Sequence, residues 1–94
     1  MKRIEIIFSQ AVEDDLTLLL NTKNIKKYTI IQNVMGQGES IPKMGDEVWP
    51  QLNTMFIIYC SDDESEIIKT ALTDLRNAYP QEGIAVFISE ANEF

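Results

Sequence analysis

The feature that most constrains the fold is a stretch of apolar residues, 54–60, that is hydrophobic on both faces of the strand it predicts. Met55, Ile57 and Tyr59 share one face of this strand, opposite Phe56, Ile58 and Cys60. Residues 84–88 repeat the pattern, with Ala85 and Phe87 opposite Ile84, Val86 and Ile88. Strands that are apolar on both sides need cover on both sides. Any fold of this chain must therefore shield both faces of one sheet.

The chain predicts four strands and two helices in the order β-α-β-β-α-β. The strands are expected at residues 3–8, 28–34, 54–60 and 84–88. One helix is expected from Val12 to the turn at residues 21–24, and the other from a capping box at residues 61–64 to Pro80. This order is that of the α+β, ferredoxin-like βαββαβ fold, an antiparallel four-stranded sheet with two helices on one face. We expect residues 1–94 to form a single domain of this class.

Two helices on one face leave the other face of such a sheet uncovered. No segment of this 94-residue chain is left over to form a third helix. Large exposed apolar patches are rare on monomers. We therefore expect the second face to meet another copy of the chain in a homo-oligomer.

Composition excludes several classes of function. Fifteen acidic against eight basic residues give a net charge of −7, which opposes nucleic-acid binding and association with anionic membranes. No segment is long and apolar enough for membrane insertion. The chain has no His, which excludes Ser-His and Cys-His nucleophile pairs, so we predict no catalytic residues and no enzyme. Its single Cys fits a reducing, cytoplasmic location.

The connection at residues 39–53 holds most of the polar candidates for a site. Gly36, Gln37 and Gly38 precede it, and their N–H groups favour either an anion-binding cleft with Ser40 or a plain turn. Acidic residues follow at Glu39, Asp46 and Glu47. They lack the spacing of a known calcium or magnesium loop, so solvated acids are the simpler interpretation and no metal site is predicted.

The same connection carries a large aromatic residue, Trp49, with Val48 and Leu52 beside it. Aromatic residues in loops are frequent contact points in interfaces. These three residues predict a contact with a partner or another subunit, and the alternative is packing against their own subunit. Cys60 lies in a core strand, where Cys usually behaves as a small hydrophobic residue.

Several short segments resemble the PII nitrogen-regulatory signal proteins and their PII-like relatives. They are Met1-Lys2-Arg3-Ile4-Glu5, Val34-Met35-Gly36-Gln37-Gly38, Ser61-Asp62-Asp63 and Val86-Phe87-Ile88-Ser89-Glu90-Ala91. The resemblance implies a trimer of ferredoxin-like subunits that binds a small-molecule effector between subunits. It further implies that residues 39–53 are a regulatory loop acting on a protein target such as a transporter or an enzyme. The effector would be bound by Gly36, Gln37, Gly38, Ser40 and Gly83.

Departures from that pattern narrow the choice of effector. PII proteins that bind ATP hold its phosphates with basic residues, whereas this chain has no Lys or Arg after Arg76. The turn before Gly83 carries Glu82 instead, so we predict that ATP and ADP bind poorly. The loop has no Tyr to be nucleotidylated, and no cofactor is identified. The alternative is a trimer resembling the CutA proteins, which would bind divalent metal ions through carboxylates or Cys60.

Overall fold

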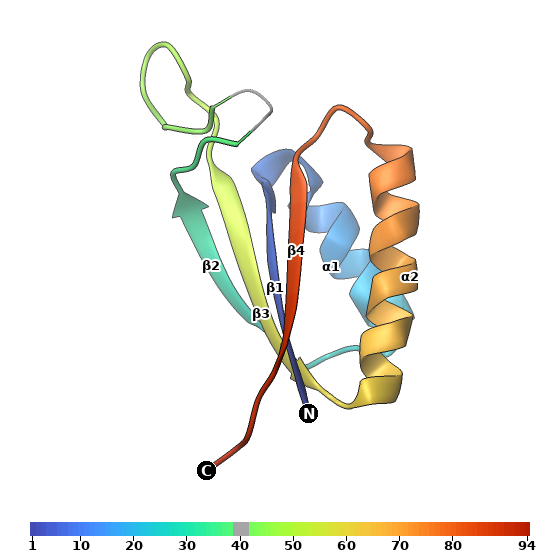
Figure 1. Cartoon of the computed structure of the whole chain (residues 1–94). Coiled ribbons are helices and arrows are strands. Elements are labelled where there is room, and N and C mark those ends of the chain that lie inside the picture. The colour runs from blue at the N-terminus through green and yellow to red at the C-terminus, as the bar shows by residue number, and fades with distance from the viewer. Residues whose placement is uncertain (39–41) are drawn as a thin grey trace.

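The computed structural model describes residues 1–38 and 42–94. Its strands are β1 (Lys2–Ser9), β2 (Thr29–Val34), β3 (Asn53–Cys60) and β4 (Ile84–Glu90). Its helices are a 3-10 turn, η1 (Gln10–Val12), and the α-helices α1 (Glu13–Thr22) and α2 (Asp62–Ala78). The strands form one antiparallel sheet in the order β2-β3-β1-β4, and both α-helices cover the same face of it (Figure 1). This is the predicted ferredoxin-like fold.

The core lies between the sheet and the two helices. Alternate residues of β1 and β3 are buried there because every second side chain of a strand points to the same face. Phe56 on β3 is central to this layer, with its ring 5.2 Å edge-on from Phe8 and 5.2 Å stacked from Tyr28. The helices contribute the buried residues Leu16, Leu20, Ile68, Leu72 and Leu75.

Local hydrogen bonds define both ends of α2. The Ser61 hydroxyl accepts from the Glu64 N–H at 3.1 Å and the Glu64 carboxylate accepts from the Ser61 N–H at 3.1 Å, so the predicted capping box is present. Near the other end, the Arg76 guanidinium donates to the carbonyl oxygen of Ile84 at 2.9 and 3.2 Å. These bonds hold the helix exit against the start of β4. The turn between them, residues 79–83, is thereby fixed at one end of the sheet.

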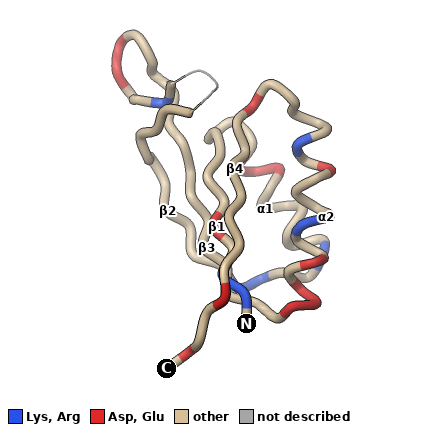
Figure 2. Tube along the Cα trace, viewed as in Figure 1, with Lys and Arg blue, Asp and Glu red and all other residues tan. Residues whose placement is uncertain are grey.

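The face of the sheet opposite the helices carries a set of apolar side chains, which we call the open face: Ile7, Ile31, Met55, Ile57, Tyr59, Ala85 and Phe87. Phe87 is 60% exposed and Tyr59 54% exposed. Arg3 and Glu5 lie on the same face and form an ion pair at 3.2 Å. Charged residues gather on the helices, in the loop between β2 and β3 and near the chain ends, and the middle of the sheet is mostly uncharged (Figure 2). The predicted two-sided apolar sheet is therefore present.

The connection between β2 and β3 contains two turns. Gly36 and Lys43 exchange two backbone hydrogen bonds of 2.7 Å, which close the first turn. In the second, the Asp46 carboxylate accepts from the N–H groups of Val48 at 3.0 Å and Trp49 at 2.6 Å. The sequence predicted an irregular segment here, and the described part of it is held by these local bonds. Within residues 1–38 and 42–94, neither helix has the length and apolar character needed to cross a membrane.

Candidate functional site

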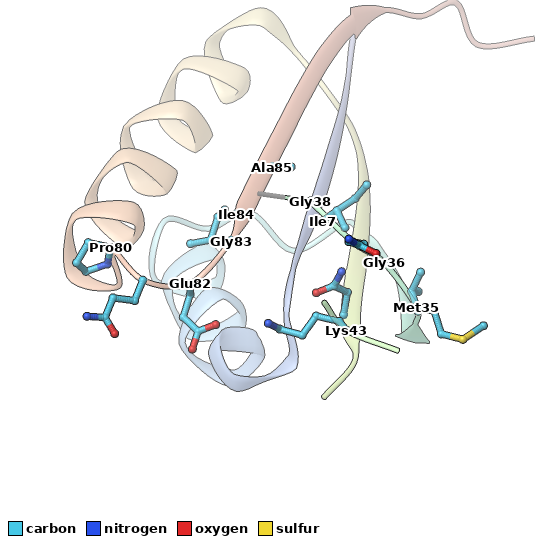
Figure 3. A pocket seen from close by; sticks show the side chains of 14 residues that line it. Ile7, Met35, Gly36, Gly38, Lys43, Pro80, Glu82, Gly83, Ile84 and Ala85 are labelled. Carbon is cyan, nitrogen blue, oxygen red and sulfur yellow. The ribbon is translucent and has the colours of Figure 1, made fainter. Parts of the chain in front are cut away.

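A cavity of about 650 Å³ lies where the root of the β2–β3 loop faces the turn between α2 and β4. Figure 1 shows these two segments at one end of the sheet, with both chain termini at the other. The described residues that line the cavity are Ile7, Val34, Met35, Gly36, Gln37, Gly38, Lys43, Asn53, Pro80, Gln81, Glu82, Gly83, Ile84 and Ala85. We call this cavity the loop-root pocket (Figure 3).

Four of the five residues proposed from the sequence to bind an effector lie around this one pocket. Gly36, Gln37 and Gly38 form its wall on the loop side, and Gly83 lies across from them on the turn before β4. The fifth, Ser40, is outside the described residues, as is Glu39. The fold thus brings together segments that are more than forty positions apart in the sequence.

Lys43 is the residue of the pocket that sequence reasoning missed. It is only 6% exposed although it carries an ammonium group, and its side chain extends toward the side on which Glu82 lies in Figure 3. A single loop lysine has no motif around it, so its position becomes visible only through the two bonds between Gly36 and Lys43. Those bonds bring the lysine back beside the glycines.

The polar groups of the pocket are suited to binding. Lys43 supplies an ammonium donor, Glu82 a carboxylate acceptor, and Gln37, Asn53 and Gln81 supply carboxamides. Among the described lining residues there is no Ser, Thr, Cys or His that could act as a nucleophile beside a base. The arrangement can therefore orient a small polar molecule through several hydrogen bonds, which is typical of a ligand site.

The two loop glycines differ in how tightly they are packed. A Cβ atom added to Gly36 would lie 2.7 Å from Nδ2 of Asn53, whereas one added to Gly38 would meet nothing within 4 Å. Gly36 therefore allows the loop to pass close to the first residue of β3. Gly38, which also lines the pocket, has room for a side chain at its Cα.

The residues proposed for partner contact lie in the second turn of the loop. Val48 is exposed and Trp49 is 39% exposed, and both backbone N–H groups are held by Asp46. Leu52 is half-buried and packs under Gly45, where an added Cβ would lie 2.9 Å from the leucine side chain. The structure thus presents Val48 and Trp49 outward and uses Leu52 to pack the turn.

The remaining candidates are Cys60 and the acidic residues, which were considered for metal binding. Cys60 is buried on the helix side of β3, and this burial, with a smaller effect of the Glu64 and Asp62 carboxylates, raises the pKa of its thiol. A raised pKa keeps the thiol protonated and unreactive at neutral pH. Within the described residues, the acids and Cys60 form no group of three that could hold a metal ion.

Solved structures of similar fold come from PII-like proteins. CPII, a nitrogen regulatory PII-like protein from Thiomonas intermedia K12 solved with ADP, AMP and bicarbonate, is 23% identical over 94% of this chain and 82% of its own, with a TM-score of 0.76. The same protein with ADP and bicarbonate gives 25% identity over the same shares, with a TM-score of 0.72. A PII-like signalling protein from Thermus thermophilus is 20% identical over 94% of this chain and 83% of its own, with a TM-score of 0.63.

Sequence comparison gives the family. No curated protein sequence matches the chain. The profile of the family described as nitrogen regulatory protein P-II matches residues 1–93, nearly the whole length. This match over nearly the whole length shows that the chain belongs to the nitrogen regulatory protein P-II family, as a divergent PII-like member.

Proposed function

We propose that this protein senses a small anionic metabolite in the loop-root pocket and reports its presence to a protein partner through the β2–β3 loop. The observation that carries the proposal is the placement of a buried ammonium group, Lys43, beside Gly36, Gln37, Gly38 and Gly83. An ammonium donor that shares a pocket with the carboxamide donors of Gln37, Asn53 and Gln81 favours an anionic ligand over a neutral one. The solved structures of CPII with bicarbonate and adenine nucleotides support an effector of this general kind.

The charge around the pocket favours a small anion over a triphosphate. Among the described lining residues Lys43 is the one cation, and Glu82 contributes a negative charge. A triphosphate would bring several negative charges next to that carboxylate without enough cations to balance them. We therefore expect bicarbonate or a small carboxylate to bind better than ATP.

The pocket borders the open face, so a second copy of the chain that covered this face would also lie against the pocket. Ile7 and Ala85 belong both to the pocket lining and to the open face. A neighbouring subunit that covered the apolar side chains of the open face could then add residues to the pocket lining. We propose a homo-oligomer, with three subunits as in the family resemblance, acting in the cytoplasm with effectors bound between subunits.

Val48 and Trp49 are the proposed contact with a regulated target such as a transporter or an enzyme, with Leu52 packed beneath them. Asp46 fixes the turn so that both side chains are displayed before a partner arrives. A preorganised turn loses little conformational entropy when it binds.

We expect Trp49→Ala to weaken partner binding or assembly more than folding, because the indole is part exposed and lies outside the core. Light scattering and pull-down of the target would be compared with the urea midpoint of the same variant. A large loss of stability with unchanged subunit mass and partner affinity would assign Trp49 to the packing of its own subunit.

Isothermal titration calorimetry with sodium bicarbonate, and with ATP in parallel, tests the effector site. We expect wild-type protein to bind bicarbonate, and Lys43→Gln to weaken that binding about 10- to 100-fold, the effect of losing one charge-assisted hydrogen bond. Lys43→Arg should retain part of the affinity because it keeps the charge. The matched control is Lys69→Gln, which removes the same charge from an exposed position on α2.

Equal bicarbonate affinity in wild type, Lys43→Gln and Lys69→Gln would exclude Lys43 from the site. ATP that bound more tightly than bicarbonate would contradict the charge argument. No observation in the described part of the chain favours the CutA-like metal-binding alternative, so we do not propose it.

A further inference from the structure

Strand β2 contains one residue more than the stretch of β3 beside it, just before the loop-root pocket. Ile31 pairs with Met55, but Val34 pairs with Asn53, so three steps along β2 match two along β3. Asn33 lies in this bulge with a φ of +61°. Residues other than glycine rarely adopt positive φ, and bulges of this kind redirect a strand.

The extra residue determines to which face of the sheet the side chains at the end of β2 point. Ile30 pairs with Phe56 on the helix side, and Ile31 pairs with Met55 on the open face. Regular alternation would return Val34 to the helix side. The bulge places Val34 opposite Asn53 instead, where both side chains line the pocket.

A set of polar side chains, which we call the clasp, surrounds this bulge: Gln10, Glu13, Gln32, Asn33 and Thr54. Glu13, the first residue of α1, accepts from the Thr54 hydroxyl at 2.6 Å through Oε1 and from the Gln32 carboxamide at 2.7 Å through Oε2. Thr54 is fully buried. One carboxylate thus joins α1, β2 and β3 beside the extra residue.

A second link comes from Gln10 in the turn before α1. Its side-chain Nε2 donates to Oδ1 of Asn33 at 2.6 Å, and its backbone N–H donates to the carbonyl oxygen of Leu52 at 3.1 Å. Gln10 therefore contacts Asn33 near the end of β2 and Leu52 just before the start of β3. These bonds can offset the cost of holding Asn33 at positive φ.

We infer that the clasp is a positioning device for the loop-root pocket: it holds the bulge that turns Val34, and the glycines after it, onto the pocket side of the sheet. Glu13 and Asn33 are then positioning residues, since neither lines the pocket. Their effect on effector affinity rests on the function proposed above. Their effect on the stability of the loop root is independent of that function, because it can be measured without any effector.

Amide hydrogen exchange measures the loop root directly. The Gly36 and Lys43 amides, which close the first turn, would be compared with the Ile6 and Phe56 amides in the central strands of the same sample. We expect Glu13→Ala and Asn33→Val to accelerate exchange at the loop root about tenfold or more relative to the central strands. Valine is branched at Cβ and rarely adopts positive φ, so Asn33→Val should remove the bulge.

Three further variants separate positioning from general destabilisation. Asp14→Ala removes the same charge from the next residue of α1, which is exposed and outside the clasp, and should leave the ratio of exchange rates unchanged. Glu13→Gln should restore most of the protection, because its carboxamide can accept from Gln32 and donate to Thr54. If Glu13→Ala fails to fold, Gln10→Ala, at an exposed position, gives the same test in a milder form.

Unchanged exchange ratios in Asn33→Val and Gln10→Ala would overturn the inference. The second readout is calorimetry with sodium bicarbonate, in which Glu13→Ala should bind about tenfold more weakly than wild type and Glu13→Gln nearly as well. If the wild-type protein itself binds no bicarbonate, that component of the proposed function fails, and the exchange ratios still decide the role of the clasp.

Discussion

Replacing Phe87 by lysine is expected to convert the proposed homo-oligomer into single subunits that remain folded. Phe87 is 60% exposed at the centre of β4, on the open face. Burying one such ring against a neighbouring subunit contributes about 1.5–3 kcal/mol. Placing an ammonium group in the same apolar contact adds the cost of desolvating it, so assembly should weaken by roughly 100-fold or more.

The fold should survive this substitution because of what lies beside Phe87 in the sheet. Its partner on β1 is Glu5, so a lysine at this position would face an opposite charge across the strands. The matched control is Leu18→Lys, which places the same charge at an apolar residue of α1 that is 66% exposed. Light scattering should give three times the 10.7 kDa subunit mass for wild type and for Leu18→Lys, and a single mass for Phe87→Lys. A wild-type protein that is monomeric would remove the basis for an effector site between subunits.

Phe56→Ala is expected to cause the largest loss of stability of any single truncation on β3. Its ring is fully buried between Phe8 and Tyr28, and removing it leaves a cavity that the sheet and helices cannot close. Truncations of this kind cost about 3–5 kcal/mol. A domain of this size is stable by only about 5–15 kcal/mol, so a large part of its stability should disappear.

Urea unfolding at one fixed protein concentration would measure this loss, because assembly makes stability depend on concentration. Leu18→Ala is the control, since it removes an apolar side chain that is mostly exposed and should cost under about 0.5 kcal/mol. A loss below about 1 kcal/mol for Phe56→Ala would mean that the layer between sheet and helices is loosely packed at this point.

The fold was predictable because local patterns and packing agree along most of the chain. The alternation through residues 54–60 predicted two apolar faces, and the burial of Phe56 with the exposure of Tyr59 shows which of the two the helices cover. The capping box at Ser61 and Glu64 was read from four consecutive residues and is present in the structure. Both features were visible because the order of residue types within one short segment agrees with the packing of the whole fold.

The architecture of the pocket was only partly predictable, because it depends on contacts between distant segments. Glycine spacing marked residues 36–38, but nothing near Lys43 indicated that backbone pairing would return it to them. Glu13 is an acidic residue in the first turn of a helix, where acids are common, yet its carboxylate binds side chains of two strands. Positive φ at Asn33 has no sequence signal as clear as a glycine. Tertiary hydrogen bonds determine each of these positions.

The measurement that tests the central claim most directly is an NMR titration of the isotope-labelled protein with sodium bicarbonate. We expect the largest amide shifts at Gly36, Gln37, Gly38 and Gly83, the residues that the fold brings to one pocket from two distant segments. Shifts should be small in the helices and at the end of the sheet that holds the termini. Saturable binding with the largest shifts away from both segments, or no binding at all, would contradict an effector site at the root of the loop.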